Sequence, residues 1–550
     1  MSSDLVRLAQ DWLAQDPDPR TREELRELLD EGDEEALRER FGAKLEFGTA
    51  GLRGELGAGP NRMNRVTVMR AAAGLAAVLG PDRHVVIGYD ARHNSDVFAR
   101  DTAAVLTGAG LRASLLPAPL PTPVLAFAVR HLGADAGVTV TASHNPPRDN
   151  GYKVYWGDGS QIVPPVDAGI SAAIDAVGPV SALPLGSPDD PGWADLGEEI
   201  VAAYLDAVTL LPLGDARELK VVYTPLHGVG GVTLTSAFLA AGFASPVTVE
   251  AQADPDPDFP TVAFPNPEEP GAMDLALELA GRVGADLVLA NDPDADRCAV
   301  GVPLPQGGHR MLTGDEVGAL LGEHVIRHTS GDDRLVATTI VSSSLLGKIA
   351  AEHGVGYEET LTGFKWIMKA GGGHGKLVYG YEEALGYSVG SGGGLPVHDK
   401  DGIGAALTVA GLAARAKRDG RTLLDLLDDQ ARRYGLHATS QLSVRVNDLS
   451  LIAGAMARLR GAPPVELGGR KVESAEDLSL GSAGLPPTDG IRYRLAGGAR
   501  VVVRPSGTEP KLKCYLETVV PVTGEVADAR AQAVRELGAL TADLSAALGL

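Results

Sequence analysis

Three aspartates alternate in the short segment N-D-P-D-A-D-R, directly after an apolar run that is typical of a buried strand. Asp292, Asp294 and Asp296 would repel one another unless a hard cation neutralised them. Mg²⁺ suits such a place because it keeps few protein ligands and also takes phosphate oxygens. An EF-hand loop would need Gly and Glu where Arg297 and Pro303 stand, which excludes that motif. The segment therefore predicts a magnesium site, and a solvated acidic turn is the alternative.

A second acidic run, D-P-D-P-D-F-P, contains Asp254, Asp256 and Asp258. Prolines separate these carboxylates, and no hydrophobic strand leads directly into the run. We expect an extended acidic loop there, and not a metal site.

A serine follows another predicted strand, in the segment T-A-S-H-N-P. Because Pro146 stops regular structure soon after it, Ser143 is expected on an exposed, tight turn. A serine hydroxyl is a weak nucleophile and needs a base or a metal beside it. His144 is a candidate base, although an orienting, hydrogen-bonding histidine is equally consistent with the segment. The G-x-S-x-G spacing of a hydrolase elbow is absent, so Ser143 is either a turn-capping serine or a nucleophile.

Three further segments carry groups that suit phosphates or sugars. In R-P-S-G-T-E-P-K, Arg504 precedes a turn rich in hydroxyls and backbone N–H groups, which is either a phosphate clamp or a β-turn with an incidental arginine. In F-G-T-A-G-L-R-G, Arg53 ends a glycine-rich stretch without Walker or dinucleotide spacing, so a structural turn is the default. In Y-E-E-A-L-G-Y, Glu382 and Glu383 would suit sugar hydroxyls, but paired glutamates are also common on surfaces.

The segments that carry these residues follow predicted strands. The order strand–helix–strand–helix–strand occurs three times, beginning near residues 84, 219 and 334, as in a parallel sheet covered by helices. The third strand of each pass ends in a polar loop: TASHNP, NDPDADR or YEEALGY. Open α/β sheets bind ligands at the carboxyl ends of their strands, so these three loops could meet in one cleft.

The two ends of the chain differ from this repeated pattern. Residues 1–40 read as helices, with a capping box formed by Thr21 and Glu24. After a helical stretch, the last part reads as strands followed by an amphipathic helix from Val526. The predicted fold is α/β, with three successive βαβαβ domains built on mixed or parallel sheets and a smaller C-terminal α+β domain. The predicted domain bounds are 1–210, 211–308, 309–435 and 436–550.

The composition limits the kind of protein. A chain of 550 residues with 44% hydrophobic and 22% charged residues is typical of a multidomain globular protein. A net charge of −23 argues against nucleic-acid binding, and local arginines, lysines or a metal must attract any anionic substrate. Cys298 and Cys514 lie far apart and indicate no disulfide framework. With no predicted signal peptide or membrane span, a cytoplasmic protein without membrane partners is expected.

Taken together, TASHNP, DPDADR, GYEEALGY and RPSGTEPK, in this order, resemble the motifs of the α-D-phosphohexomutase superfamily. FGTAGLRG, TPLHG, FPNPEEP and TGFKW fit as well, so the resemblance covers nearly the whole chain. FGTAGLRG, TGFKW and the long helical N-terminus are similar to the branch of long-form phosphoglucomutases and phosphopentomutases. The chain departs from many relatives at Ala384, where they carry Ser, and from some at Tyr387, where they carry His. The resemblance implies four domains around a central cleft.

The resemblance also implies a role for each motif. Ser143 would carry the phosphoryl group, and its phosphate would bind Mg²⁺ together with the three aspartates. Lys153, in the string NGYK, matches a lysine proposed as an acid or base, and His144 and Arg53 complete the expected catalytic set. The expected substrate-binding residues are Arg297, Gly363 and Lys365 in the cleft, Glu382 and Glu383 for sugar hydroxyls, and Arg504, Ser506, Gly507 and Thr508 for the phosphate that is not reacting.

The reaction expected from this resemblance interconverts a hexose 1-phosphate and a hexose 6-phosphate. Phospho-Ser143 would give its phosphoryl group to the sugar, the resulting bisphosphate would reorient, and its other phosphate would return to the serine. Glucose is the favoured sugar, with glucose 1,6-bisphosphate as intermediate and activator, and mannose and pentose phosphates are alternatives. A mobile last domain is expected, because reorientation needs room. The expected protein is a monomer or homodimer whose partner is a small phosphosugar.

Two other function classes compete with this reading. The D-x-D spacing of Asp292 and Asp294 is also found in phosphatases that form an aspartyl-phosphate, but Asp296 and the pair Ser143–His144 argue against that class. A non-catalytic sugar-phosphate sensor would keep the clamp residues and lose the nucleophile or the metal carboxylates. The chain has both.

Overall fold

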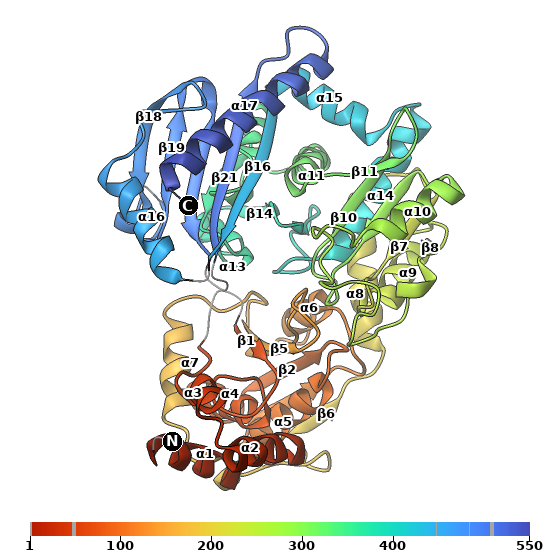
Figure 1. Cartoon of the computed structure of the whole chain (residues 1–550). Helices are drawn as coiled ribbons and strands as arrows, with labels where there is room; N and C mark the ends of the chain where they lie inside the picture. Colours follow the sequence, from red (N-terminus) through yellow and green to blue (C-terminus); the bar gives the residue numbers. More distant parts are fainter. Residues whose placement is uncertain (1–2, 47–50, 447, 483, 507–510, 550) are drawn as a thin grey trace. The chain divides into compact units, whose positions relative to one another are not determined.

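The computed structural model describes residues 3–46, 51–446, 448–482, 484–506 and 511–549 (Figure 1). The chain forms two compact units. Unit 1 consists of Met1–Met311, Gly386–Val389 and Leu395–Gly411. Unit 2 consists of Leu312–Leu385, Gly390–Gly394 and Leu412–Leu550.

The first sheet of unit 1 has six strands in the order β1-β5-β4-β2-β3-β6. Strands β2, β3, β4 and β6 pair in parallel, β5 is antiparallel to β4, and β1 is antiparallel to β5. The strands β2 and β4 are almost wholly buried, in keeping with their apolar runs and with the helices α5 and α6 that pack on them. The strands are β1 (Leu52–Glu55), β2 (His84–Tyr89), β3 (Arg112–Leu115), β4 (Ala136–Val140), β5 (Asp149–Trp156) and β6 (Trp193–Asp195).

The helices of this first domain lie before, between and after its strands. They are α1 (Ser3–Gln15), α2 (Pro19–Glu31), α3 (Glu34–Phe41), α4 (Arg65–Leu79), α5 (Ser95–Gly108), α6 (Thr122–His131), α7 (Val166–Asp175) and α8 (Glu199–Thr209). The predicted capping box is wrong, because α2 begins at Pro19 and Asp18 caps it by accepting a hydrogen bond from the backbone N–H of Arg20. Proline fits the first helical position and aspartate the preceding one, which moves the helix start ahead of Thr21.

The second sheet of unit 1 has the order β11-β10-β9-β7-β8. Strand β7 pairs in parallel with β8 and β9, whereas β10 is antiparallel to both β9 and β11. The tight connection from β9 to β10 carries the three aspartates. The elements are β7 (Val221–Thr224), α9 (Gly230–Ala240), β8 (Val247–Thr248), α10 (Asp274–Val283), β9 (Leu287–Ala290), β10 (Ala299–Pro303) and β11 (His309–Met311).

Unit 2 begins with a parallel core in which β12 pairs with β13 on one side and β14 on the other. Its elements are α11 (Gly314–His328), β12 (Arg334–Thr339), α12 (Leu345–Glu352), β13 (Gly356–Thr360), α13 (Phe364–Ile367), β14 (Lys376–Glu382) and α15 (Leu423–Tyr434). The chain also contains β15 (Gly386–Val389), in unit 1, and α14 (Gly402–Arg418), which begins in unit 1 and ends in unit 2.

The C-terminal sheet of unit 2 is antiparallel throughout, in the order β16-β21-β20-β19-β18-β17. Helix α17 packs along β16 and β21, as Figure 1 shows. The elements are β16 (Leu436–Arg445), α16 (Leu449–Gly461), β17 (Glu466–Leu467), β18 (Arg470–Asp477), β19 (Ile491–Leu495), β20 (Arg500–Pro505), β21 (Lys511–Val520) and α17 (Val526–Leu548). Short 3₁₀ turns occupy Val180–Ala182, Glu250–Gln252, Ala370–Gly373, Leu478–Leu480 and Ala496–Gly498.

These sheets confirm the predicted α/β class, with three passes of alternating strands and helices followed by a smaller α+β domain. The main departure concerns strands that the sequence did not reveal, such as β5, β10 and β18. The antiparallel strands β5 and β10 extend the two sheets of unit 1, which makes these sheets mixed.

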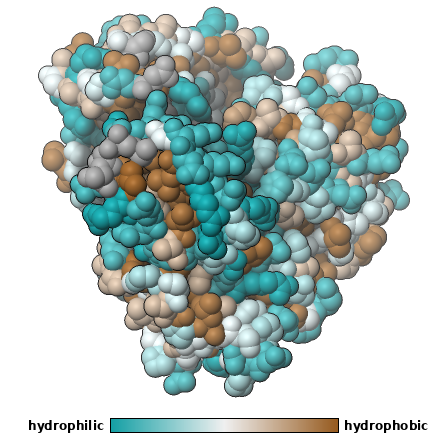
Figure 2. Space-filling view, turned by 60° about the horizontal axis from the view of Figure 1, so that its bottom comes forward, coloured by the Kyte–Doolittle hydropathy of each residue, from teal (hydrophilic) through white to brown (hydrophobic). Residues whose placement is uncertain are grey.

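On the face shown in Figure 2, hydrophobic residues are interspersed with hydrophilic ones. Within the described part of the chain, no helix is both long and apolar enough to cross a bilayer.

A buried ion network joins the two halves of unit 2. Glu517, on β21 and 2% exposed, accepts a hydrogen bond from Ser343 Oγ (2.7 Å) and pairs with Arg500 (3.1 Å). Arg500 also pairs with Glu359 on β13, at 3.0 Å. Burial acts to raise the pKa of Glu517, but Arg500 and His437 outweigh it and lower that pKa to about 2. The ionised carboxylate therefore stabilises unit 2.

We predict that Glu517→Gln lowers the thermal unfolding midpoint at pH 7 by roughly 5–10 °C, because Arg500 loses one partner of a buried pair. A carboxyl with a depressed pKa stabilises the fold above its unfolded pKa of 4.5 and loses this effect as the pH falls towards 2. The difference in thermal unfolding midpoint between wild type and variant should therefore become smaller as the pH falls from 4.5 to 2. Thermal unfolding across this range measures it, with Glu473→Gln on the exposed face of β18 as control. A gap that does not change with pH contradicts the assignment.

Candidate active site

Ser143 stands just after β4, in a left-handed backbone conformation that is rare for residues other than glycine. Its φ is 53°, and its backbone N–H donates to Thr141 Oγ1 at 2.8 Å. Such a conformation costs roughly 1–2 kcal/mol, so the surrounding structure must impose it. The residue is 3% exposed, which corrects the prediction of an exposed turn. Its Oγ donates to Asp292 Oδ2 at 2.6 Å and lies 3.2 Å from His144 Nδ1.

The three alternating aspartates form one buried cluster after β9. Asp292, Asp294 and Asp296 are at most 1% exposed, and one carboxylate oxygen of each lies within 4.8 Å of the others. The interpretation as a solvated acidic turn is therefore wrong. Asp294 Oδ2 accepts hydrogen bonds from Lys153 Nζ and Thr122 Oγ1, both at 2.8 Å. The second acidic run, from Asp254 to Asp258, is a loop, as expected.

The donor set fits a hard divalent cation. Asp294 Oδ1 and Asp296 Oδ1 are buried and have no hydrogen-bond partner among the described residues. Unsatisfied buried oxygens are costly unless something binds them, and carboxylates are the ligands that Mg²⁺ prefers. Burial and the neighbouring carboxylates raise the pKa of Asp292 well above its usual range. Burial would also raise the pKa of Asp294, but Lys153 holds it below its usual value.

Lys153 and Arg297, both predicted site residues of unit 1, contact this cluster directly. Lys153 lies on β5 opposite Thr139 of β4, and its Nζ reaches Asp294 at 2.8 Å and Asp296 at 3.2 Å. Burial would lower the pKa of Lys153, but the two aspartates raise it, so the amine is protonated at neutral pH. The backbone N–H of Arg297 donates to Asp292 Oδ1 at 3.1 Å, and its guanidinium lies 3.9 Å from the same carboxylate.

Arg53 and His144 lie on the serine side of the cluster. Arg53 pairs with Gly151 across β1 and β5, and its guanidinium donates to Asn145 Oδ1 at 2.8 Å, in the serine turn. Burial, followed by the charges of Arg297 and Arg53, lowers the pKa of His144 well below its usual value, so the imidazole is neutral at pH 7. The structure thus brings together every predicted site residue of unit 1.

The described site residues that the sequence predicts in unit 2 lie at the ends of β14 and β20 and on α13. Glu383 Oε2 accepts hydrogen bonds from Ser342 Oγ (3.2 Å) and Thr339 Oγ1 (3.3 Å). Burial raises the pKa of Tyr515, with the charges of Glu383 and Glu382 adding to it and that of Arg504 opposing it, so these groups lie near one another. Lys365 is buried on the short helix α13, and Gly363 caps that helix with a φ of 104°. Ser506 follows β20, whereas Gly507 and Thr508 lie outside the described residues.

Sequence reasoning missed two buried cations of unit 1. Lys400 lies 3.2 Å from Asp296 Oδ2, although it is more than a hundred residues away in sequence. Arg92 binds the backbone of the serine turn, where its guanidinium donates to Ser143 O at 2.7 Å. Arg92 follows β2, beside β4, so the rule that ligand sites lie at the carboxyl ends of strands could have found it. Nothing in the sequence around Lys400 points to Asp296.

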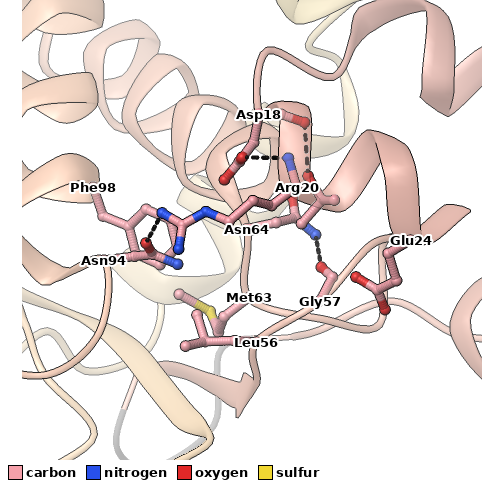
Figure 3. Close-up of a pocket in the computed structure, with 10 residues that line it drawn as sticks. Asp18, Arg20, Glu24, Leu56, Gly57, Met63, Asn64, Asn94 and Phe98 are labelled. Carbon is pink, nitrogen blue, oxygen red and sulfur yellow. Dashed lines mark hydrogen bonds between the residues drawn. The ribbon is translucent and has the colours of Figure 1, made fainter. Parts of the chain in front are cut away.

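A pocket of about 180 Å³ lies elsewhere in unit 1 (Figure 3). It is lined by residues of α2, the segment after β1 and the start of α5, and it contains none of the predicted site residues. Its polar groups bind one another: Asn64 Nδ2 donates to Gly57 O at 2.8 Å, and Arg20 donates to Asn94 Oδ1 at 3.4 Å. The pocket therefore adds nothing to the chemistry around Ser143.

Comparison with known proteins agrees with this fold. Models of the phosphoglucomutase/phosphomannomutase α/β/α domains I, II and III match residues 44–179, 202–304 and 313–434, and the model of the C-terminal domain matches residues 443–537. A Haemophilus influenzae protein named "Probable phosphomannomutase" is 46% identical over 83% of this chain and 93% of its own length. The Mus musculus "Phosphopentomutase" is 37% identical over 93% of this chain and 89% of its own length.

A solved structure shows the same fold. The phosphoglucomutase/phosphomannomutase family protein from Burkholderia thailandensis superposes with a TM-score of 0.67 at 20% identity, over 91% of this chain and 97% of that one. The chain has three α/β domains and an antiparallel C-terminal domain, with Ser143 after β4 and the three aspartates after β9. Together with the relatives, this defines an enzyme of the phosphosugar mutase class. The chain belongs to the phosphoglucomutase/phosphomannomutase family.

The buried oxygens of the aspartate cluster generate a prediction about metal binding. Asp294→Asn should weaken Mg²⁺ or Mn²⁺ binding at least about tenfold, because it removes one charged ligand of a set of three. Isothermal titration of the chelator-treated protein with each metal measures this. Asp254→Asn, in the exposed acidic loop, is the matched control and should bind as wild type does. Equal loss in both variants, or no loss in either, would show that the ion binds elsewhere.

Proposed function

We propose that this phosphosugar mutase interconverts a hexose 1-phosphate and a hexose 6-phosphate, with glucose as the preferred sugar, through a phosphoserine at Ser143. The observation that carries the proposal is the 2.6 Å contact between Ser143 Oγ and Asp292, one of three buried carboxylates that fit a divalent cation. Bound to Asp292, Asp294 and Asp296, Mg²⁺ would supply charge neutralisation for the phosphoryl oxygens.

The chain's own residues then share the work of transfer. In the first half, the bond from Ser143 Oγ to phosphorus breaks while a sugar hydroxyl oxygen forms the new bond to phosphorus, which yields the bisphosphate. The sugar hydroxyl loses its proton as its oxygen bonds to phosphorus, and the serine oxygen gains one as it leaves. Lys153 is protonated and buried beside the cluster, so it fits giving its proton to the leaving serine oxygen and taking up the hydroxyl proton in exchange. After the sugar reorients, the same steps run in reverse with its other phosphate. Glucose 1,6-bisphosphate is then both the intermediate and the activator that first phosphorylates Ser143.

The remaining predicted residues hold the substrate in this proposal. Arg53, Arg297 and Lys365 bring positive charge to the phosphosugar within a strongly acidic protein. Glu382 and Glu383 accept hydrogen bonds from sugar hydroxyls, and Gly363 lets the backbone before Lys365 adopt its positive φ. The phosphate that is not reacting is held by Arg504, Ser506, Gly507 and Thr508. His144 orients the Ser143 hydroxyl, in keeping with a neutral imidazole 3.2 Å away.

The relatives support two alternatives for the sugar. The name of the Haemophilus influenzae relative points to mannose phosphates, and that of the mouse relative points to pentose phosphates. Either sugar would undergo the same reaction, because the serine and the metal carboxylates act on phosphate and not on the sugar ring. We also propose a cytoplasmic location, which the two free, buried cysteines support.

We predict that Ser143→Ala lowers kcat at least about 1,000-fold, because it removes the group that carries the phosphate. Ser181→Ala, an exposed serine of the same domain, should keep wild-type activity. Mass spectrometry of wild type after treatment with glucose 1,6-bisphosphate should find phosphate on the peptide containing Ser143. A fully active Ser143→Ala protein would contradict the covalent scheme, and binding of sugar phosphate without turnover by wild type would favour a sensor.

A second experiment identifies the sugar. Initial rates are measured with the 1-phosphates of glucose, mannose, ribose and deoxyribose, each with its matching bisphosphate as primer. The highest kcat/KM is expected for glucose 1-phosphate. A preference of tenfold or more, roughly 1.4 kcal/mol, for mannose or a pentose would replace glucose in the proposal and leave the phosphoserine mechanism in place.

A further inference from the structure

Arg92 binds the backbone of the serine turn with the two terminal nitrogens of its guanidinium group. The residue directly follows β2 and is 4% exposed. Its two terminal nitrogens donate to four backbone carbonyls, three in the turn between β4 and β5 and one at the first residue of β5. These are the carbonyls of Ser143 (2.7 Å), Asn145, Pro146 (2.8 Å) and Asp149 (3.1 Å).

The other side of Arg92 is fixed as well. Asp90 Oδ1 accepts a hydrogen bond from the Arg92 backbone N–H at 3.0 Å, and Asp90 Oδ2 lies 3.5 Å from Nε. Ser95 Oγ donates to the same aspartate at 2.6 Å, and the guanidinium stacks over the ring of Phe259 at 4.9 Å. Because its terminal nitrogens are hydrogen-bonded and its guanidinium packs on Phe259, this side chain has little freedom to move and fixes the backbone that it binds.

This contact acts on the strained residue of the site. Ser143 has a positive φ, and a non-glycine residue keeps such a conformation only where its neighbours impose it. Thr141 Oγ1 holds the peptide group before Ser143, and Arg92 holds the carbonyl after it. These two contacts set the direction of the Ser143 side chain, whose Oγ reaches Asp292 at 2.6 Å.

We propose that Arg92 is a positioning residue for phosphoryl transfer, which fixes the Ser143 peptide so that Oγ faces the three aspartates. The inference rests on the proposed role of Ser143 as the phosphate carrier. This role differs from the substrate binding proposed for Arg53 and Arg297. The terminal nitrogens of Arg92 are occupied by four carbonyls, and the residue is almost fully buried. Its loss should therefore slow transfer and leave substrate affinity nearly unchanged.

The test measures single-turnover transfer from phospho-Ser143 to a sugar monophosphate. Arg92→Lys keeps the charge but replaces a planar fork with one ammonium, which cannot serve four carbonyls. We expect the transfer rate to fall about 100-fold and KM to change less than about threefold. The transfer rate of Arg92→Ala should be lower still. Millimolar guanidinium should raise that rate at least about tenfold, because it can enter the vacated site.

The matched control is Arg65→Ala, which removes a bidentate pair with Asp101 in the same unit. Guanidinium should not raise the transfer rate of Arg65→Ala. The substitution itself should lower thermal stability and leave the transfer rate unchanged. A guanidinium effect of equal size in both alanine variants, or wild-type transfer by Arg92→Lys, overturns the inference. If neither Arg92 variant folds, Asp90→Asn takes their place, since it loosens the guanidinium with Arg92 retained, and unchanged transfer in that variant also overturns it.

The same measurement separates this inference from the proposed function. Wild type that cannot be phosphorylated at Ser143 defeats the proposed function itself. Wild type that is phosphorylated and transfers normally, with Arg92 variants that transfer equally fast, defeats only the positioning role.

Discussion

Three carboxylates buried within reach of one another are the constraint on which the rest of unit 1 depends. Like charges at this spacing, out of water, repel strongly, and Lys153, Lys400 and Arg297 lie close enough to offset part of this repulsion. Two oxygens of the cluster have no protein partner among the described residues, which supports the proposal that a divalent cation binds there. The surrounding structure follows from holding that cluster in place. The antiparallel strand β5 delivers Lys153, the start of α6 delivers Thr122, and the segment that returns to unit 1 delivers Lys400.

The same constraint explains the unusual backbone of the serine turn. Ser143 must point at the cluster and not away from it, which a regular continuation of β4 would not achieve. Its positive φ turns the side chain towards Asp292, and Ala295 in the aspartate loop adopts a similar conformation, with a φ of 54°. The serine turn and the aspartate loop thus each contain one non-glycine residue with a positive φ. Strain of this kind is usual at functional sites and is held by the structure around it, here by Thr141 and Arg92.

Much of this could be predicted from the sequence, because the decisive signals are local. The apolar runs of β4 and β9 predict strands that end just before Ser143 and the three aspartates, and the structure confirms both strands. What failed depends on contacts between distant segments. The burial of Ser143 comes from the aspartate loop, and β5 reads as a loop because it opens with Asp-Asn-Gly. Lys400 acts through a tertiary contact to Asp296 that no local pattern reveals, whereas Arg92 stands just after β2, where the rule for carboxyl ends of strands could have found it.

The most direct test of the central claim is anomalous diffraction from crystals of the phosphorylated protein grown with Mn²⁺. The account predicts one strong peak about 2.2 Å from an oxygen of each of Asp292, Asp294 and Asp296, with the fourth contact from a phosphate oxygen on Ser143. A peak bound by other residues, or an ion among the aspartates with the phosphate of a fully active enzyme on a different side chain, would contradict it.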